Sequence, residues 1–171
     1  MDRRIASLAI AFMAPLSACA HGEAAGSSAS AQIAHVGKAA PDWSEPSIPG
    51  PKLSLASLRG KAIYLNFFAT WCPPCNEEAP SIDALAREYA DRGVQIVGVD
   101  VLENASKAAQ FRNAHHLSYP VVVDSGSLRD QYEVNGLPVH VFIDKSGTVR
   151  KIVVGELSPA MMRDNIERVL R

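Results

Sequence analysis

The chain has 171 residues, of which 47% are hydrophobic and 20% are charged, with 17 lysines and arginines against 18 aspartates and glutamates. This length and apolar content allow one domain with a sizeable core and a short appendage. A formal net charge of −1 argues against nucleic acid as a partner, and three cysteines are too few for a disulfide scaffold. No apolar run reaches the roughly 18 to 20 residues of a spanning helix, which excludes an integral membrane protein.

The first residues have the pattern of an export signal. Two arginines precede a mostly apolar stretch, residues 5–15, which has the length of the hydrophobic region of a signal peptide. The Leu-Ser-Ala-Cys motif that ends at Cys19 resembles a bacterial lipobox, in which cleavage precedes the cysteine and its thiol receives a diacylglyceryl group. We therefore expect a signal peptide at 1–18 and lipidation of Cys19. Ordinary cleavage after Ala20, which leaves no anchor, is the alternative.

The next segment, residues 19–35, is rich in alanine, glycine and serine and shows no apolar period. This composition is typical of a flexible tether. We expect an exported protein that faces the bacterial periplasm or the cell exterior. It would be held to a membrane by the lipid or otherwise be soluble, and its single globular domain would span 36–171.

The globular part begins with a broken stretch and continues with long apolar segments. Residues 43–61 contain three prolines and two glycines, which predicts short edge strands and turns. The run 62–69 is apolar on both faces apart from Asn66, so a central strand covered on both sides is expected. Residues 73–90 carry apolar side chains at helical spacing and predict a helix, which Pro80 should kink.

The alternation of strands and helices continues to the end of the chain. Further strands are predicted at 94–101, 120–123, 139–144 and 148–154, and helices at 104–115, at 128–132 and from Pro159, with Ser158 as its cap. Strands that alternate with helices and are followed by a hairpin predict an α/β fold. Its mixed central sheet would carry helices on both faces.

Two cysteines lie where the predicted central strand gives way to the first long helix, in the sequence Trp71-Cys72-Pro73-Pro74-Cys75. One helical turn brings sulfurs at this spacing into bonding range, and the helix N-terminus stabilises a thiolate on the first of them. Such a thiolate attacks a substrate disulfide, and the second cysteine resolves the mixed disulfide. A zinc site would need further ligands, and a bridge across so short a loop adds little stability. The motif therefore favours redox exchange, with no metal.

Two sequence blocks together resemble a known family. The sequence FFATWCPPC at 67–75, followed by Gly136-Leu137-Pro138, is similar to the TlpA/ResA/CcmG-like group of exported thiol–disulfide oxidoreductases in the thioredoxin superfamily. The resemblance covers essentially all of 36–171. It implies a thioredoxin-like fold with an extra β–α insertion between the CxxC helix and the cis-proline strand. It also implies an enzyme that uses its own redox-active disulfide and no cofactor.

The resemblance assigns roles to single residues. Cys72 corresponds to the exposed nucleophile, and Cys75 to the more buried resolving thiol. Pro138, if its peptide bond is cis, would let the backbone of Leu137 pair with an extended substrate segment. Its alternative is a strand-opening proline. Trp71 would shield the disulfide, or would be a partly buried core aromatic.

Glu78 is the most informative residue outside the cysteines. It lies four residues before Ile82 and seven before Leu85, so helical spacing turns it toward the apolar face. A carboxylate there should be desolvated, with a raised pKa, and could exchange a proton with a cysteine thiol. Some members of the resembled group have a functional acid at this place. The alternative is a helix-start glutamate favoured by the dipole, as we expect for Glu77.

Four other polar residues receive weaker expectations. Asn66 stands where thioredoxin has a buried aspartate and should satisfy buried backbone groups. His115 and His116 are expected to be core or surface histidines rather than ligands. His140 follows the predicted cis-proline by two residues, where it could be a plain strand residue or a cation that tunes the thiolate.

The function that these patterns predict is disulfide reduction outside the cytoplasm. Electrons would come from a membrane thiol–disulfide donor, and family likeness suggests apocytochrome c as the client protein. An oxidase or isomerase of exported proteins is one alternative. A copper metallochaperone on the same fold is another, although its group has a Cys-x-x-x-Cys motif, one residue longer than Cys72–Cys75. A thiol peroxidase would need threonine at position 69, where this chain has alanine.

Overall fold

The computed structural model describes residues 32–171 and contains a mixed six-stranded sheet in the order β2-β6-β5-β4-β7-β8. The central strands β4 (Ala62–Phe68), β5 (Val94–Asp100) and β6 (Val121–Val123) are parallel. β7 (Val139–Ile143) and β8 (Val149–Val154) form an antiparallel hairpin against β4. The predicted α/β architecture is confirmed, and each long strand lies within one or two residues of its predicted bounds.

The proline-rich stretch forms the short edge structure that was predicted. β1 (Ser44–Glu45) pairs with β3 (Leu53–Ser54) in a small separate sheet. β2 (Ser47–Ile48) adds to the main sheet as an antiparallel edge strand beside β6. A 3₁₀ turn, η1 (Leu55–Leu58), follows. The segment therefore closes one edge of the sheet and contributes to one of its faces.

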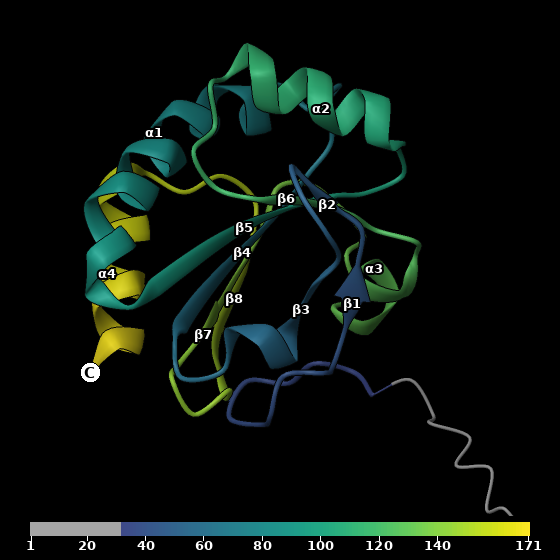
Figure 1. Cartoon of the computed structure of the whole chain (residues 1–171). Helices are drawn as coiled ribbons and strands as arrows, with labels where there is room; N and C mark the ends of the chain where they lie inside the picture. Colours follow the sequence, from purple (N-terminus) through teal and green to yellow (C-terminus); the bar gives the residue numbers. More distant parts are fainter. Residues whose placement is uncertain (1–31) are drawn as a thin grey trace, which may run out of the picture.

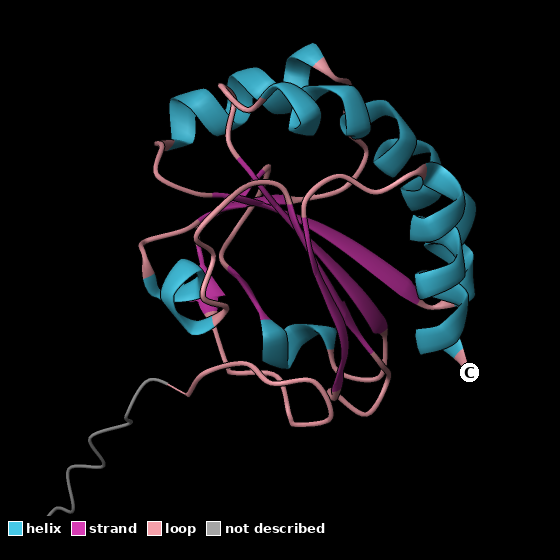
Figure 2. Ribbon diagram, turned by 180° about the vertical axis from the view of Figure 1, so that it is seen from behind, coloured by secondary structure: helices cyan, strands magenta, loops and turns pink. Residues whose placement is uncertain are grey.

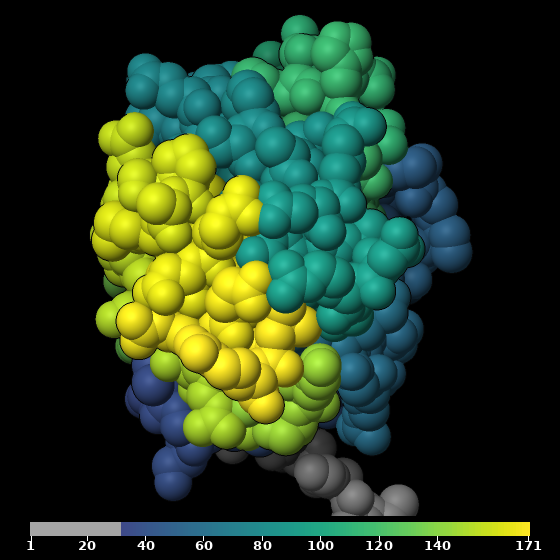
Figure 3. Space-filling view, turned by 90° about the vertical axis from the view of Figure 1, so that its left-hand side faces the viewer, coloured from purple at the N-terminus to yellow at the C-terminus, as the bar shows by residue number. Residues whose placement is uncertain are grey.

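Helices cover both faces of the sheet, but unequally (Figures 1 and 2). α1 (Pro73–Tyr89), which η2 (Ala90–Arg92) extends, α2 (Ala105–Ala114) and α4 (Pro159–Leu170) pack on one face. The short α3 (Ser127–Gln131) and η1 pack on the other. Figure 3 shows α1 and α4 side by side as one continuous surface. The interval between α1 and β7 holds two strand–helix units, β5–α2 and β6–α3, which accommodates the predicted extra unit.

β4 organises both halves of the core because all seven of its residues are buried. Successive side chains of a strand point to opposite faces. Tyr64 and Phe68 accordingly belong to the cluster beneath α1, α2 and α4, whereas Leu65 and Phe67 belong to the cluster on the α3 side. Parallel β5 and antiparallel β7 pair with β4 along most of its length and fix the end of the strand from which α1 starts.

Local signals set the helix ends. Ser158 caps α4 by accepting a hydrogen bond from the N–H of Met161 at 3.3 Å, and Pro159 is the first helical residue, as predicted. Asn104 caps α2 in the same way. α1 continues through Pro80 and ends at Tyr89. The start of α1 is capped by Cys72, so a cysteine of the redox motif occupies a cap position.

The described chain enters the domain at the end of the sheet opposite to the start of α1 (Figure 1). Ala34 is buried and donates its N–H to the carbonyl of Gln131 at 2.8 Å, so contacts begin within the segment predicted as a tether. Ala40 donates to the carbonyl of Gly147 at 2.9 Å, in the turn between β7 and β8. The predicted signal peptide, Cys19 and most of the tether lie outside the described residues. Among residues 32–171, no helix is long and apolar enough to cross a membrane.

Candidate active site

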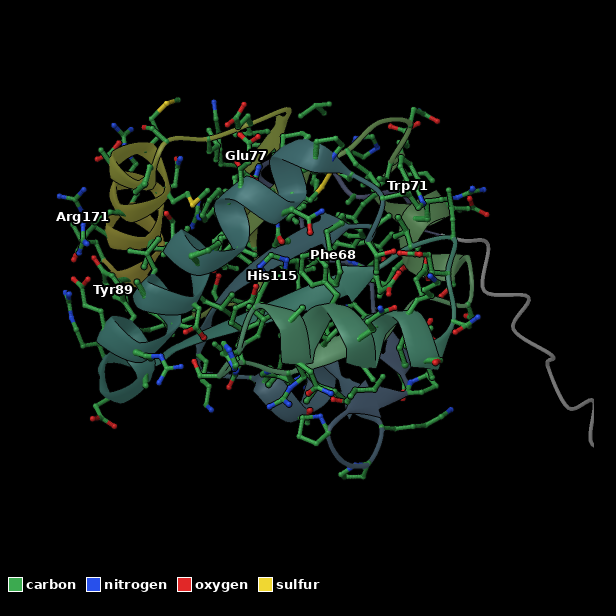
Figure 4. All side chains as sticks on the ribbon, turned by 90° about the horizontal axis from the view of Figure 1, so that it is seen from above. Phe68, Trp71, Glu77, Tyr89, His115 and Arg171 are labelled. Atoms are coloured by element: carbon green, nitrogen blue, oxygen red, sulfur yellow. A yellow bond between two sulfur atoms is a disulfide. The ribbon has the colours of Figure 1, made fainter. Side chains whose placement is uncertain are left out.

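The site is centred on a disulfide between Cys72 and Cys75, in the first turn of α1 (Figure 4). Cys72 is the N-cap residue, and its Sγ accepts a hydrogen bond from the N–H of Cys75 at 3.3 Å. Unpaired N–H groups and the helix dipole favour negative charge at this point. Pro73 occupies the first helical position, where its missing N–H removes no helical hydrogen bond. The first sulfur therefore lies where a thiolate is stabilised.

The expected difference in burial between the two cysteines is absent from the disulfide form. Cys72 and Cys75 are each 3% exposed. The prediction of an exposed nucleophile and a more buried partner was wrong for this form of the protein, because the short bridge holds both sulfurs under the same turn. The asymmetry that remains is electrostatic, since Cys72 alone holds the cap position.

Exposed apolar side chains form a surface next to the disulfide. Trp71 is 62% exposed, so it is not a partly buried core aromatic, and Figure 4 shows it at the rim of the molecule, on the far side of the start of α1 from Glu77. Leu102 is 64% exposed, and partly buried Leu137 is close to both. These three side chains line a hollow of about 480 Å³, together with Val101, Arg129, Asp130, Glu133, Val134, Asn135 and Gly136.

The cis-proline loop lies beside this hollow. The Leu137–Pro138 peptide bond is cis, and Pro138 directly precedes β7. Val139 pairs with Phe67 near the end of β4, the strand that leads into the cysteines. The structure thus brings Trp71, Leu137 and Pro138 to the disulfide end of the sheet, although these residues are far apart in the sequence.

Glu78 is buried one helical turn beyond Cys75, as its spacing predicted. It is 4% exposed, and its Oε1 accepts a hydrogen bond from the N–H of Leu157 at 2.5 Å. Burial raises the pKa of Glu78 to about 7, an effect that Leu157 opposes and that the nearby charge of Glu156 strengthens. Glu77, by contrast, is exposed at the preceding position of the helix.

A shallow hollow connects Glu78 with the surface. It has a volume of about 440 Å³ and is lined by Glu77, Glu78, Ser81, Glu156, Leu157, Ser158, Pro159 and Met162. The carboxyl group can therefore exchange protons with solvent although its side chain is packed against the sheet.

His140 is a second polar group beneath α1, and the sequence left open whether it is a plain strand residue or a cation that tunes the thiolate. His140 is 0% exposed, with its Nε2 3.5 Å from Glu78 Oε2 and its Nδ1 2.8 Å from the hydroxyl of Tyr64. The Nδ2 of Asn66 is 3.4 Å from the same Nδ1. Asn66 therefore contacts a side chain, whereas backbone groups were expected as its partners. Burial lowers the pKa of His140 to about 4, an effect that a contact with the backbone of Gly155 opposes. The lowered pKa favours a neutral imidazole near pH 7, which argues against the predicted alternative of a cation there.

A further carboxyl pair fixes the loop before the cysteines. Glu103 accepts hydrogen bonds from the N–H and the hydroxyl of Thr70, at 2.5 Å and 2.6 Å. Asp100, at the end of β5, is 0% exposed, and apart from an interaction with Glu103 its oxygens have no hydrogen-bond partner among residues 32–171. Burial raises its pKa to about 7, and the charge of Glu103 adds to the effect. Sequence reasoning missed this pair because only the parallel pairing of β5 with β4 places it beside Thr70.

The other histidine near the site has a packing role. His115 Nε2 is 2.9 Å from the Oδ1 of Asn76, whose amide donates to the carbonyls of Thr70 and Cys72. The ring of His115 lies against Phe111, and burial lowers the pKa of His115. Within the part of the chain that the structure describes, no group of three or more histidine, cysteine, aspartate or glutamate side chains could hold a metal ion.

Comparison with known proteins identifies the fold and the type of site. Residues 36–152 match the model of the AhpC/TSA family. The chain is 33% identical over 135 residues to the thiol-disulfide oxidoreductase ResA of Bacillus thuringiensis strain Al Hakam, covering 78% of each chain.

Solved structures agree. A thiol:disulfide interchange protein of the thioredoxin family from Chlorobium tepidum TLS superposes with a TM-score of 0.74 at 32% identity, over 80% of this chain and 99% of that one. A secreted disulfide oxidoreductase of Mycobacterium tuberculosis, homologous to E. coli DsbE, gives a TM-score of 0.67 at 26% identity over 74% and 95%. The predicted thioredoxin-like fold is confirmed.

The raised pKa of Glu78 has a measurable consequence for stability. Its folded pKa lies above the ordinary value of 4.5, so the carboxyl group destabilises the fold as pH rises from about 4.5 through about 7. Glu78→Gln should remove this loss, which we expect to be about 3 kcal/mol between pH 4 and pH 8.

The measurement is denaturant unfolding of the oxidised protein and the variant across this pH range, with Glu77→Gln as the matched control. Parallel stability curves for the parent and Glu78→Gln would contradict the buried, proton-holding state of Glu78.

Proposed function

The chain belongs to the AhpC/TSA family and is a thiol–disulfide oxidoreductase of the ResA/DsbE type, and from this premise we propose that it reduces disulfides of exported client proteins through Cys72 and Cys75. The observation that carries the proposal is the position of Cys72 at the N-cap of α1, where its Sγ accepts a backbone N–H. A thiolate there is stabilised without any further cation.

The proposed reaction has two exchange steps. The Cys72 thiolate attacks one sulfur of the client disulfide, a mixed disulfide forms, and the other client sulfur leaves as a thiolate that takes up a proton. Cys75 then loses its proton, attacks the Sγ of Cys72 and releases the second client sulfur, so the Cys72–Cys75 disulfide is restored. The client gains two electrons and two protons, and a membrane dithiol donor returns them to the protein.

Glu78 is the group that we propose takes the proton of Cys75. It follows Cys75 by one helical turn, is buried, and has a pKa of about 7, between that of an ordinary carboxyl and that of a thiol. A base with a pKa near the working pH transfers protons efficiently in both directions. The hollow that reaches Glu78 provides the exchange of this proton with solvent.

Client binding is proposed for the exposed apolar surface that lies across the disulfide from Glu78. Trp71 would cover the exchanging sulfurs with an apolar surface, and the backbone of Leu137, preceding cis Pro138, would pair with an extended client segment. Both line the same hollow beside the start of α1. A peptide there would have its disulfide next to Cys72.

The location and the client extend the proposal. The pattern of the first 18 residues and Cys19 supports export and lipid anchoring on the outer side of a membrane. Because that side is oxidising, a reductase there depends on a dedicated membrane electron donor. The client class that we propose is a protein with a closely spaced disulfide, such as apocytochrome c before haem attachment.

Single-cysteine variants test the assigned roles. Cys72→Ser should abolish disulfide exchange, whereas Cys75→Ser should retain the attacking thiol and accumulate mixed disulfides with the client, because only the first sulfur is activated by the helix. Thiol alkylation against pH in the two variants is the measurement. A Cys75 thiol that titrates lower and alkylates faster than Cys72 would reverse the assignment.

The reduction potential tests the direction. A client-specific reductase should have a potential near that of thioredoxin, about −270 mV, and not near the oxidant DsbA, about −120 mV. Equilibration of Cys72–Cys75 with glutathione and dithiothreitol buffers gives the value. A potential at the oxidant end, with many unrelated exported proteins trapped by Cys75→Ser, would favour the oxidase or isomerase. Tight copper binding with negligible exchange would favour the metallochaperone.

The proposed anchor is tested by removing its cysteine. Cys19→Ala should move the protein from the membrane fraction to the soluble fraction, since a single apolar signal without two acyl chains holds a protein weakly. Membrane fractionation after carbonate washing is the measurement, with Cys75→Ser as the control for the loss of a thiol. A parent protein that is already soluble would remove the anchor from the proposal.

A further inference from the structure

Glu78 faces a buried histidine that no step of the proposed exchange uses. Glu78 Oε2 and His140 Nε2 lie 3.5 Å apart, and neither atom has a side-chain hydrogen-bond partner among the described residues. Both atoms are shielded from solvent, because Glu78 is 4% and His140 is 0% exposed. Unpaired polar atoms at such depth are costly, so a facing pair of them points to an interaction of their own.

The other side of the imidazole fixes which nitrogen carries the proton. The Tyr64 hydroxyl lies 2.8 Å from His140 Nδ1, and the Asn66 amide nitrogen lies 3.4 Å from the same atom. An amide NH₂ only donates hydrogen bonds, so the Asn66 contact favours an accepting Nδ1, and the Tyr64 hydroxyl can donate to the same atom. In a neutral imidazole the proton is then on Nε2, the nitrogen that faces Glu78.

The strand register holds this arrangement in place. Asn66 and His140 are direct cross-strand partners of β4 and β7, and Tyr64 is paired with Phe142, on whose ring it stacks at 4.5 Å between centroids. Tyr64, His140 and Phe142 all come from strands whose residues are fully buried at these positions. The imidazole therefore has little freedom to turn away from Glu78.

We propose that His140, held by Tyr64 as the Nε2–H tautomer, is a positioning residue that donates to the Glu78 carboxylate and so keeps Glu78 able to accept the proton of Cys75. This inference rests on the proposed proton-carrying role of Glu78. A donor aimed at the ionised carboxyl favours ionisation, and so it limits the rise in pKa that burial causes. Without this donor, the ionised form of Glu78 would be less stable and a smaller share of the carboxyl groups would be free to accept a proton at neutral pH.

Other groups around Glu78 raise or lower its pKa, or respond to its charge. The N–H of Leu157 donates to Oε1 and lowers the pKa of Glu78. The charge of Glu156, in the loop before α4, raises it. Tyr119, before β6, is buried and its pKa is raised in part by the charge of Glu78. The backbone of Gly155 forms a hydrogen bond with the imidazole of His140 and raises its pKa. Among these neighbours, only His140 faces the oxygen that has no partner.

The test is nuclear magnetic resonance of the oxidised protein, labelled with ¹⁵N in histidine and ¹³C in the glutamate carboxyl groups. We expect His140 in the Nε2–H tautomer throughout the titration of Glu78. In His140→Leu the Glu78 titration should move up by about one pH unit. Tyr64→Phe should give a smaller upward shift, because the tautomer is no longer fixed. His140→Gln, which restores a donor, should return the titration toward that of the parent.

Tyr132→Phe is the matched control, since Tyr132 is a buried tyrosine of the opposite core face whose hydroxyl has no partner among the described residues. It should leave the Glu78 titration unchanged. An Nδ1–H tautomer or a charged His140, or an unchanged Glu78 titration in both His140→Leu and Tyr64→Phe, would overturn the inference. Should His140→Leu fail to fold, the Tyr64→Phe titration alone decides.

Measurements of exchange separate this inference from the proposed function. The pH at which Cys75 resolves a mixed disulfide should rise in His140→Leu in parallel with the Glu78 titration. A Glu78 titration that moves while the exchange profile does not would support the histidine–glutamate coupling and count against the proton role of Glu78. A parent protein without exchange activity would contradict the proposed function, and the titration would still decide the inference.

Discussion

The junction between β4 and α1 is the constraint on which the rest of the site depends. β4 is buried along its whole length and is paired on both sides, so its end is fixed relative to the sheet. The amide of Asn76 binds the carbonyls of Thr70 and Cys72, and Glu103 binds Thr70 from the neighbouring strand end. With the loop held from both sides, the first sulfur can only lie at the helix cap.

The two sides of this junction differ in polarity and in exposure to solvent. On one side lie the exposed apolar groups, Trp71 and Leu102, with partly buried Leu137 beside them. On the other side, beneath α1, lie the buried Glu78 and His140. Recognition of a protein surface needs exposed apolar area, whereas proton transfer at neutral pH needs a shielded carboxyl group, and one helix turn separates the two requirements.

The fold and the depth of Glu78 followed from the sequence because both depend on local periodicity. The apolar run of β4 and the helical spacing from Glu78 to Leu85 are visible in one dimension. The partners of Glu78 were not, since they depend on which residue of β7 faces Asn66 across the sheet. The burial of Cys72 was misjudged for a different reason, because a three-residue bridge pulls both sulfurs under one turn.

The two ends of β7 have different neighbours. Its chain enters beside the turn between β7 and β8, where Ala40 binds Gly147, while Pro138 begins the same strand at the other end. A five-residue strand spans about 17 Å, so the turn that Ala40 contacts is separated from the cis-proline by the length of β7. One end of β7 therefore lies beside Ala40, near the start of the described chain, and the other end leads to the cis-proline at the disulfide end of the sheet.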